Sequence, residues 1–91
     1  MSQSITHDQA KHQFEITIDG HTGVVTYSES EGVWIVDHTF VPDALRGQGV
    51  AAMLVEAAFV AAREAGVKIE PACSYVARYM ERHSETADLL A

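Results

Sequence analysis

Residues 41–52 read VPDALRGQGVAA, and this stretch joins the end of a strand and a proline turn to a glycine-spaced loop and the start of an apolar helical run. The first turn of a helix carries backbone N–H groups that have no acceptor within the chain, and the helix dipole adds positive charge there. Gly47 and Gly49 remove side chains that would hold a ligand off, and Arg46 can grip a phosphate with two donors. The stretch therefore predicts an anion site of the kind that binds a pyrophosphate.

The residues before this loop predict three short antiparallel strands. Residues 12–19 alternate apolar and polar positions, residues 23–28 continue as a second strand, and residues 33–41 form a third. The connections are short, as in an antiparallel meander. Because the third strand is apolar on both faces for much of its length, we expect it to be central and covered on both sides. Residues 1–11 are expected to form a loose tail.

The residues after the loop predict a helix over 48–65, a strand over 67–70 and a second helix over 74–83, with a last short turn over 85–90. The order β-β-β-α-β-α makes the long helix a crossover between the third and last strands, which implies a parallel pair. We therefore predict an α/β (α+β) fold with a mixed sheet, in which an antiparallel meander is joined to a parallel crossover pair. A ligand would lie at the carboxyl end of the third strand.

Composition excludes several classes of protein. A chain of 91 residues has room for one core and is read as a single domain, 1–91. The net charge of −7 argues against a nucleic-acid partner, and no apolar run reaches the ~18–20 residues of a membrane helix. The polar N-terminus does not resemble a secretory signal, and a single cysteine suits a reducing cytoplasm. No spacing of histidines predicts a metal site.

Two phosphate-binding patterns compete for the loop. Gly47-x-Gly49-x-x-Ala52, with Glu70 roughly 20 residues further on, fits a relaxed dinucleotide fingerprint. We rank it lower because too little chain follows the loop for a dinucleotide-binding domain. A P-loop is excluded because no Gly-Lys-Ser/Thr follows. The remaining pattern is Arg46-x-x-Gly49-x-Ala51, which resembles the coenzyme A pyrophosphate loop of the GNAT acetyltransferase superfamily.

Over roughly residues 12–90 the chain resembles the minimal, single-domain members of that superfamily. The matching pieces are HTFVP at 38–42, LRGQGVA at 45–51, VKI at 67–69 and CSYV at 73–76. The resemblance implies a GNAT-like fold, acetyl-CoA as cofactor and transfer of the acetyl group to a primary amine. Larger members carry further N-terminal elements around the acceptor. This chain lacks the length for them, so an open site would admit a protein lysine or N-terminus as acceptor.

The resemblance also implies a set of site residues. It places the pantetheine arm along the backbone at 40–41 and the pyrophosphate on the loop, and a backbone N–H near residues 40–41 would polarise the thioester carbonyl. The cofactor-binding residues are then Phe40, Val41, Arg46, Gly47, Gln48, Gly49, Val50 and Ala51. It places His38 and Cys73 beside the thioester and Tyr79 as a general acid.

Each of these three side chains has a structural alternative. His38 suits a general base, but strict alternation puts it on one face with Trp34 and Val36, where a hydrogen-bonded core histidine is equally expected. A position near a helix start lowers the pKa of Cys73. Cys73 could then form an acetyl-thioester intermediate or donate a proton to the leaving sulfur. The structural alternative is a small buried hydrophobic residue, which a lone intracellular cysteine commonly is. Tyr79, which we favour over Tyr75, would otherwise be a packing residue.

Three functions remain open on the sequence alone. The first is a minimal N-acetyltransferase. The second is a non-catalytic CoA or acyl-CoA sensor or partner module, which would bind CoA without turnover. The third is a small structural α/β domain whose glycine loop is only a turn. An edge strand on the N-terminal side could pair between chains, although nothing in the residues requires it.

Overall fold

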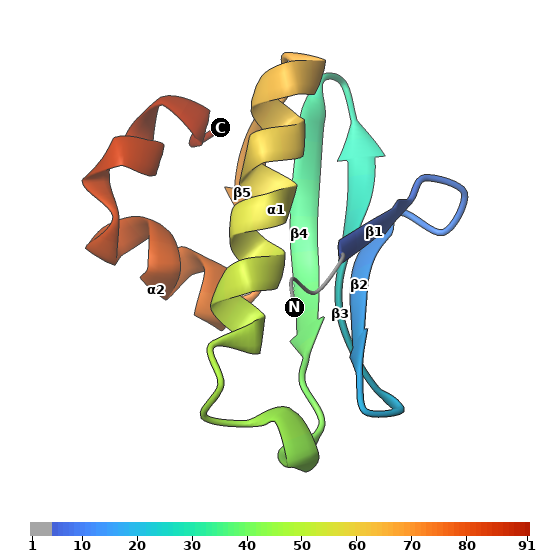
Figure 1. Ribbon diagram of the computed structural model, residues 1–91. Helices are drawn as coiled ribbons and strands as arrows, with labels where there is room; N and C mark the ends of the chain where they lie inside the picture. The colour runs from blue at the N-terminus through green and yellow to red at the C-terminus, as the bar shows by residue number, and fades with distance from the viewer. Residues whose placement is uncertain (1–4) are drawn as a thin grey trace.

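The protein, described by a computed structural model for residues 5–91, is built on one five-stranded sheet in the order β1-β2-β3-β4-β5, with helix α1 lying along it (Figure 1). The strands are β1 (Ile5–Asp8), β2 (Gln13–Ile18), β3 (His21–Ser30), β4 (Val33–Phe40) and β5 (Lys68–Pro71). The helices are α1 (Val50–Ala65) and α2 (Ser74–Arg82), and short 3-10 turns cover Asp43–Leu45 (η1) and Ser84–Leu89 (η2).

The strand pairing confirms the predicted topology. Strands β1 to β4 form an antiparallel meander, and β4 pairs with β5 in parallel across the α1 crossover. The β2–β3 turn at Asp19 and Gly20 and the β3–β4 turn at Glu31 and Gly32 have positive φ at both central residues. Such turns match the right-handed twist of the strands that they join, which fixes the register of both hairpins.

The expected N-terminal tail is wrong for Ile5–Asp8, while residues 1–4 lie outside the described part of the chain. Strand β1 pairs with β2, with Ile5 opposite Ile16 and Asp8 opposite Gln13. The ring of His7 stacks on Phe14 with 4.0 Å between centroids, and its Nε2 lies 2.6 Å from the Tyr27 hydroxyl. A strand whose only aliphatic residue is Ile5 gives little alternation to detect, so tertiary contacts and not local pattern define β1.

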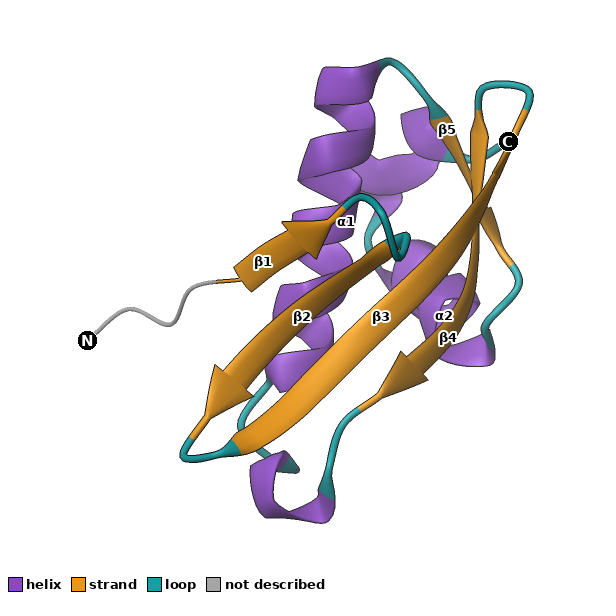
Figure 2. Cartoon of the chain, turned by 90° about the vertical axis from the view of Figure 1, so that its right-hand side faces the viewer, coloured by secondary structure: helices purple, strands orange, loops and turns teal. Residues whose placement is uncertain are grey.

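The core lies between α1 and one face of the sheet. Helix α1 buries Val50, Leu54, Val55, Ala58, Phe59 and Ala62, whereas Ala65 at its end is exposed. Both helices lie behind the sheet in Figure 2, and no helix covers the face turned toward the viewer. On that outer face Val33 and Ile35 are only half-buried. Strand β4 is therefore central in the sheet, as expected, but the expectation that it is covered on both sides is wrong.

The two edges of the sheet differ. Leu90 forms a parallel bridge with Ile69, and the Ala91 N–H donates to the Ile69 carbonyl over 2.9 Å, so the C-terminal residues cover the outer edge of β5. The outer edge of β1 has no strand beside it within residues 5–91. Within the same residues no helix is both long and apolar enough to cross a membrane.

Gly23 on β3 sets how closely α1 approaches the sheet. A Cβ atom at this position would lie 3.3 Å from Val50 Cγ1 and 3.4 Å from the Phe40 carbonyl oxygen. The absent side chain therefore lets the first turn of α1 lie directly beside the end of β4, which is where the sequence predicts the ligand.

We expect Gly23→Val to destabilise the protein by about 1–3 kcal/mol, because the added atoms overpack this contact. Urea denaturation followed by circular dichroism would measure the free energy of unfolding. Thr22→Val, at the exposed neighbouring position, is the matched control and should change it by less than about 0.5 kcal/mol. Equal unfolding midpoints for the two variants would show that the contact is not tight.

Candidate active site

The loop between β4 and α1 has the backbone that its glycines allow. After the η1 turn Arg46 is extended, with φ −64° and ψ 147°, and Gly47 and Gly49 have φ of +80° and +73°. These left-handed conformations suit glycine because it has no Cβ to clash with the backbone. Gly49 is the N-cap of α1, so the helix begins at Val50, two residues later than we predicted.

The first turn of α1 is left open to an anion. Within residues 5–91 no side chain caps it, and the turn contains no acidic residue. Its N–H groups are therefore not occupied by the described side chains, which usually satisfy them at a helix start. Arg46 forms an ion pair with Asp43, 3.1 Å long, in which both side chains are mostly exposed. Such a pair contributes little and leaves the guanidinium able to turn to a ligand.

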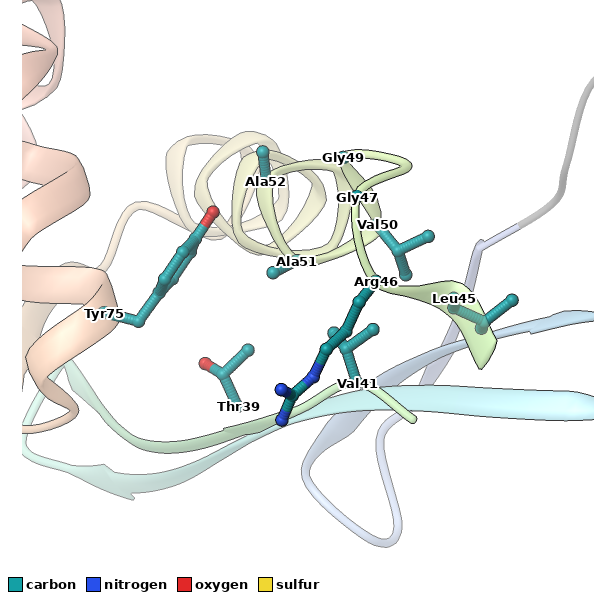
Figure 3. A pocket seen from close by; sticks show the side chains of 10 residues that line it. All are labelled: Thr39, Val41, Leu45, Arg46, Gly47, Gly49, Val50, Ala51, Ala52 and Tyr75. Atoms are coloured by element: carbon teal, nitrogen blue, oxygen red, sulfur yellow. The ribbon is translucent and has the colours of Figure 1, made fainter. Parts of the chain in front are cut away.

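A cavity of about 370 Å³ joins this helix start to the end of β4 and the start of α2. Figure 3 shows the first turn of α1 on one side, Thr39 and Val41 on the opposite side and the Tyr75 ring between them at one end. Six of the eight predicted cofactor residues line it: Val41, Arg46, Gly47, Gly49, Val50 and Ala51. Phe40 is 51% exposed, and Gln48 turns its amide to the Ala44 carbonyl at 3.3 Å; neither lines the cavity.

Strand β4 keeps one side unpaired beside this cavity. Strand β5 pairs with it only over Val33–Val36, and the Val36 carbonyl then accepts the N–H groups of Ala72 and Cys73 as the chain turns into α2. Beyond Val36, β3 is the only strand next to β4 within residues 5–91. The cavity therefore adjoins a strand edge that can hydrogen-bond to an extended ligand as a neighbouring strand would.

A β-bulge at Asp37 decides which side chains reach the cavity. Tyr27 pairs with Val36 and Thr26 pairs with His38, so β4 has one residue more than β3 at this point. Such an insertion reverses the alternation that follows it. The carboxylate of Asp37 accepts hydrogen bonds from Thr26 at 2.8 Å and Ser28 at 3.4 Å, which fixes the bulge.

The bulge corrects our placement of His38. We expected it on one face with Trp34 and Val36, but those two residues are buried against α1 and His38 is exposed on the outer face. Thr39, opposite the buried Val25, faces the helix side and lines the cavity. The polar Asp37 that interrupts an apolar run is the sequence signal that could have indicated this reversal.

Cys73 lies at the N-cap of α2, half-buried, with its Sγ 3.6 Å from the Thr39 hydroxyl oxygen. Burial acts to raise the pKa of the thiol. Interactions with the Thr39 hydroxyl and with backbone N–H groups, chiefly those of Val76 and Tyr75, outweigh it, so the pKa of Cys73 lies below its ordinary value. Each of these groups can donate a hydrogen bond to the thiolate and so stabilises it. The structure thus pairs Cys73 with Thr39, a residue that our sequence analysis missed, and not with His38.

We expect the thiol to show this pairing directly, because Cys73 is the only cysteine of the chain. A lowered pKa keeps more thiolate at pH 7, and Thr39→Val removes one stabilising donor. The midpoint of the alkylation rate against pH, measured with iodoacetamide, should therefore rise, and the rate at pH 7 should fall about threefold to tenfold. Thr39→Ser should retain the wild-type profile. An unchanged profile in Thr39→Val would contradict the pairing.

The two tyrosines of α2 lie in different places from those we expected. Tyr79 packs edge-on to Phe59 and stacks on His83, with 4.0 Å between the latter two centroids. It lines an adjoining cavity of about 170 Å³, and burial, with smaller contributions from Glu56 and Glu85, raises its pKa. Tyr75, which we ranked below Tyr79, lines both cavities. The structure therefore brings Tyr75, and not Tyr79, to the glycine loop.

The fold and the site together define a class of protein. An antiparallel meander, a crossover helix with an open first turn and a strand edge beside it form the GNAT-like mixed sheet that the sequence predicted. A sequence profile described as GCN5-related N-acetyl-transferase matches residues 13–89. The chain belongs to this GNAT family.

Individual relatives agree with this assignment. Protein NATD1 from Mus musculus and protein NATD1 from Gallus gallus are each 37% identical to the chain over 82 residues, which cover 87% of this chain and 74% of each relative. The solution structure of a GCN5-like protein from Staphylococcus aureus superimposes with a TM-score of 0.77 at 29% identity, covering 97% of this chain and 87% of that one.

Proposed function

We propose that this protein binds acetyl-CoA and transfers its acetyl group to a primary amine in the cytoplasm. One observation carries the proposal. The cavity runs from the open first turn of α1, past the unpaired side of β4, to Tyr75 and Thr39, and the Thr39 hydroxyl contacts the Cys73 thiol behind it. These are an anion site, a strand-like edge and a thiol with a lowered pKa, in the order in which a pyrophosphate, a pantetheine arm and a thioester follow one another.

The cofactor would be held largely by backbone. Gly49, Val50 and Ala51 line the cavity at the open helix start, so their N–H groups would hold the pyrophosphate. Among residues 5–91, Arg46 is the only charged residue that lines the cavity. Although the chain has a net charge of −7, it presents a cation at the place where the pyrophosphate would bind. The backbone at Phe40 and Val41 would hydrogen-bond to the pantetheine arm and supply an N–H to the thioester carbonyl.

The transfer needs a base for the amine and an acid for the leaving sulfur. As the amine nitrogen attacks the thioester carbonyl, a C–N bond forms, the C–S bond breaks, and the sulfur of CoA leaves with the bonding pair. We assign protonation of that sulfur to the Cys73 thiol, oriented by Thr39, and no acyl group is carried on Cys73. His38 lies on the outer face of the sheet, away from the cavity, so we do not assign it as the base, and the proton of the amine would pass to solvent at the unpaired edge of β4. Tyr79 would act as an acid only through a movement of α2, and Tyr75 is nearer the loop.

We further propose a protein lysine or N-terminus as the acceptor. Within residues 5–91 no helix covers the outer face of the sheet (Figure 2), and β5 does not pair with β4 beyond Val36, so the described part of the chain leaves room for a large acceptor to approach the cavity. Release of CoA, quantified by chromatography, would be compared between a lysine-containing peptide and small amines such as putrescine. We expect kcat/KM to be higher for the peptide. Efficient turnover of small amines alone would contradict a protein acceptor.

A further inference from the structure

A second groove lies on the flank of α1 away from the glycine loop, between this helix and β1. It has a volume of about 480 Å³, and its walls are formed by Ile5 and Phe14 from the strands and Met53, Ala57 and Val60 from α1. Val60 is 54% exposed, although it is a large apolar residue. The acetyl transfer proposed above uses none of these residues.

The groove is negatively charged. Glu56 and Glu64 of α1 stand on its rim, and no lysine or arginine lines it. The remaining titratable residue that lines it is His7, and burial is the main cause that lowers its pKa and so disfavours a positive charge on its ring. A neighbouring cavity of about 300 Å³ shares His7 and Glu64 and extends to Trp34. An occupant that matches this surface has an apolar part and positive charge.

The groove also runs beside an unpaired strand edge. The outer edge of β1 has no neighbouring strand within residues 5–91, whereas Leu90 and Ala91 cover the edge of β5. Unpaired N–H and C=O groups on an edge strand are a template for an added strand. A strand added to β1 would direct alternate side chains to the side on which the groove lies.

We propose that an extended, basic segment of a partner protein adds to β1 as a sixth strand, with an apolar side chain in this groove and basic side chains beside Glu56 and Glu64. In a strand, positions i, i+2 and i+4 share a face. A basic-x-apolar-x-basic segment therefore presents one apolar side chain to the groove with basic side chains on both sides of it, near the two glutamates. Main-chain pairing with side-chain pockets is an established mode of peptide recognition.

Two other occupants fit the charges less well. A nucleic acid would bring phosphates to the carboxylates of Glu56 and Glu64. A second copy of the chain in a twofold arrangement would bring its own two glutamates to the same interface, where like charges oppose each other.

The test uses the full chain and a terminally blocked peptide, acetyl-Arg-Thr-Val-Thr-Arg-amide. Arginine replaces lysine so that the peptide cannot be an acetyl acceptor, which keeps the result independent of the proposed enzyme activity. Trp34 is the only tryptophan and lines the neighbouring cavity that shares His7 and Glu64 with the groove, so its fluorescence is expected to report binding. We expect a saturable change, together with amide chemical-shift changes confined to β1 and the facing side of α1.

The controls separate the groove from general electrostatics. Glu56→Gln/Glu64→Gln should weaken peptide binding about fivefold to tenfold, as expected for the loss of two exposed ion pairs. Glu31→Gln/Glu70→Gln removes the same charge at exposed positions outside the groove and should leave affinity within about twofold. A peptide with glutamate in place of both arginines should not bind.

Three results would overturn the proposal. The first is the absence of saturable binding at millimolar peptide, and the second is an equal loss of affinity in the two double variants. The third is a concentration-dependent dimer in sedimentation velocity that forms through the edge of β1. Loss of this dimer in Val60→Glu, which alters the groove, would identify that edge as the interface. That result would assign the edge to a second copy of the chain.

Discussion

Replacing Gly49 with glutamate is expected to lower the affinity for acetyl-CoA by at least about 100-fold, which corresponds to about 2.7 kcal/mol. The residue is the N-cap of α1 and has a φ of +73°, a conformation that a side chain disfavours. Its carboxylate would accept the open N–H groups of the first turn and repel the pyrophosphate. Calorimetric titration of the wild type and the variant with acetyl-CoA measures the effect.

Gly32→Glu is the matched control. Gly32 has a φ of +78°, and, as at Gly49, no atom lies within 4 Å of an added Cβ, but it sits in the β3–β4 turn at the opposite end of β4. It introduces the same charge and a similar backbone strain away from the loop, so acetyl-CoA affinity should stay within about threefold of wild type. If both variants bind equally, the pyrophosphate does not lie at Gly49.

Cys73→Ala is expected to lower the rate of acetyl transfer by about 100-fold or more, the usual range for removal of a positioned acid. The affinity for acetyl-CoA should stay within about threefold, because the loop and the β4 edge are unchanged. Chromatographic detection of CoA with saturating acceptor gives kcat, and titration gives affinity. Ser74→Ala, an exposed neighbour at the same helix start, should retain the full rate.

Two outcomes of that experiment point elsewhere. Full turnover by Cys73→Ala would show that Cys73 is not the general acid, and Tyr75 or Tyr79 would then be the candidate for that role. Tight binding of acetyl-CoA by the wild type without turnover of any amine would favour the CoA sensor that the sequence left open. Binding of acetyl-CoA by the wild type that is lost in Gly49→Glu would favour the acetyltransferase or the CoA sensor over a structural domain with no ligand.

The parts of the fold that the sequence predicted are those in which local pattern and tertiary structure agree. Alternation in β2 and β3, the glycine turns and the long apolar helix each restrict the chain on their own. Strand β1 could not be predicted because His7 owes its position to Phe14 and Tyr27, which are distant in sequence. The uncovered outer face was missed for a related reason, since Val33 and Ile35 are apolar but only half-buried.

At the site, the glycine loop could be predicted because a backbone requirement selects glycine directly. The side chains around it could not, because their directions depend on the bulge at Asp37 and on the path of α2. The family resemblance selected His38 and strict alternation put it on one face with Trp34 and Val36, whereas the structure places Thr39 at the cavity. Helical periodicity does not distinguish Tyr75 from Tyr79 until the packing of Tyr79 on Phe59 is known.

The bulge in β4 has a consequence for comparing this chain with its relatives. The strand contains one residue more than its pleat needs, and both Asp37 and His38 lie on the outer face. Deleting either one would restore a regular strand and still leave Thr39 beside Cys73. A homologue one residue shorter here would thus keep the same cavity. Whether a sequence alignment places its gap at Asp37 or at His38 would decide whether a residue of that homologue is aligned with His38.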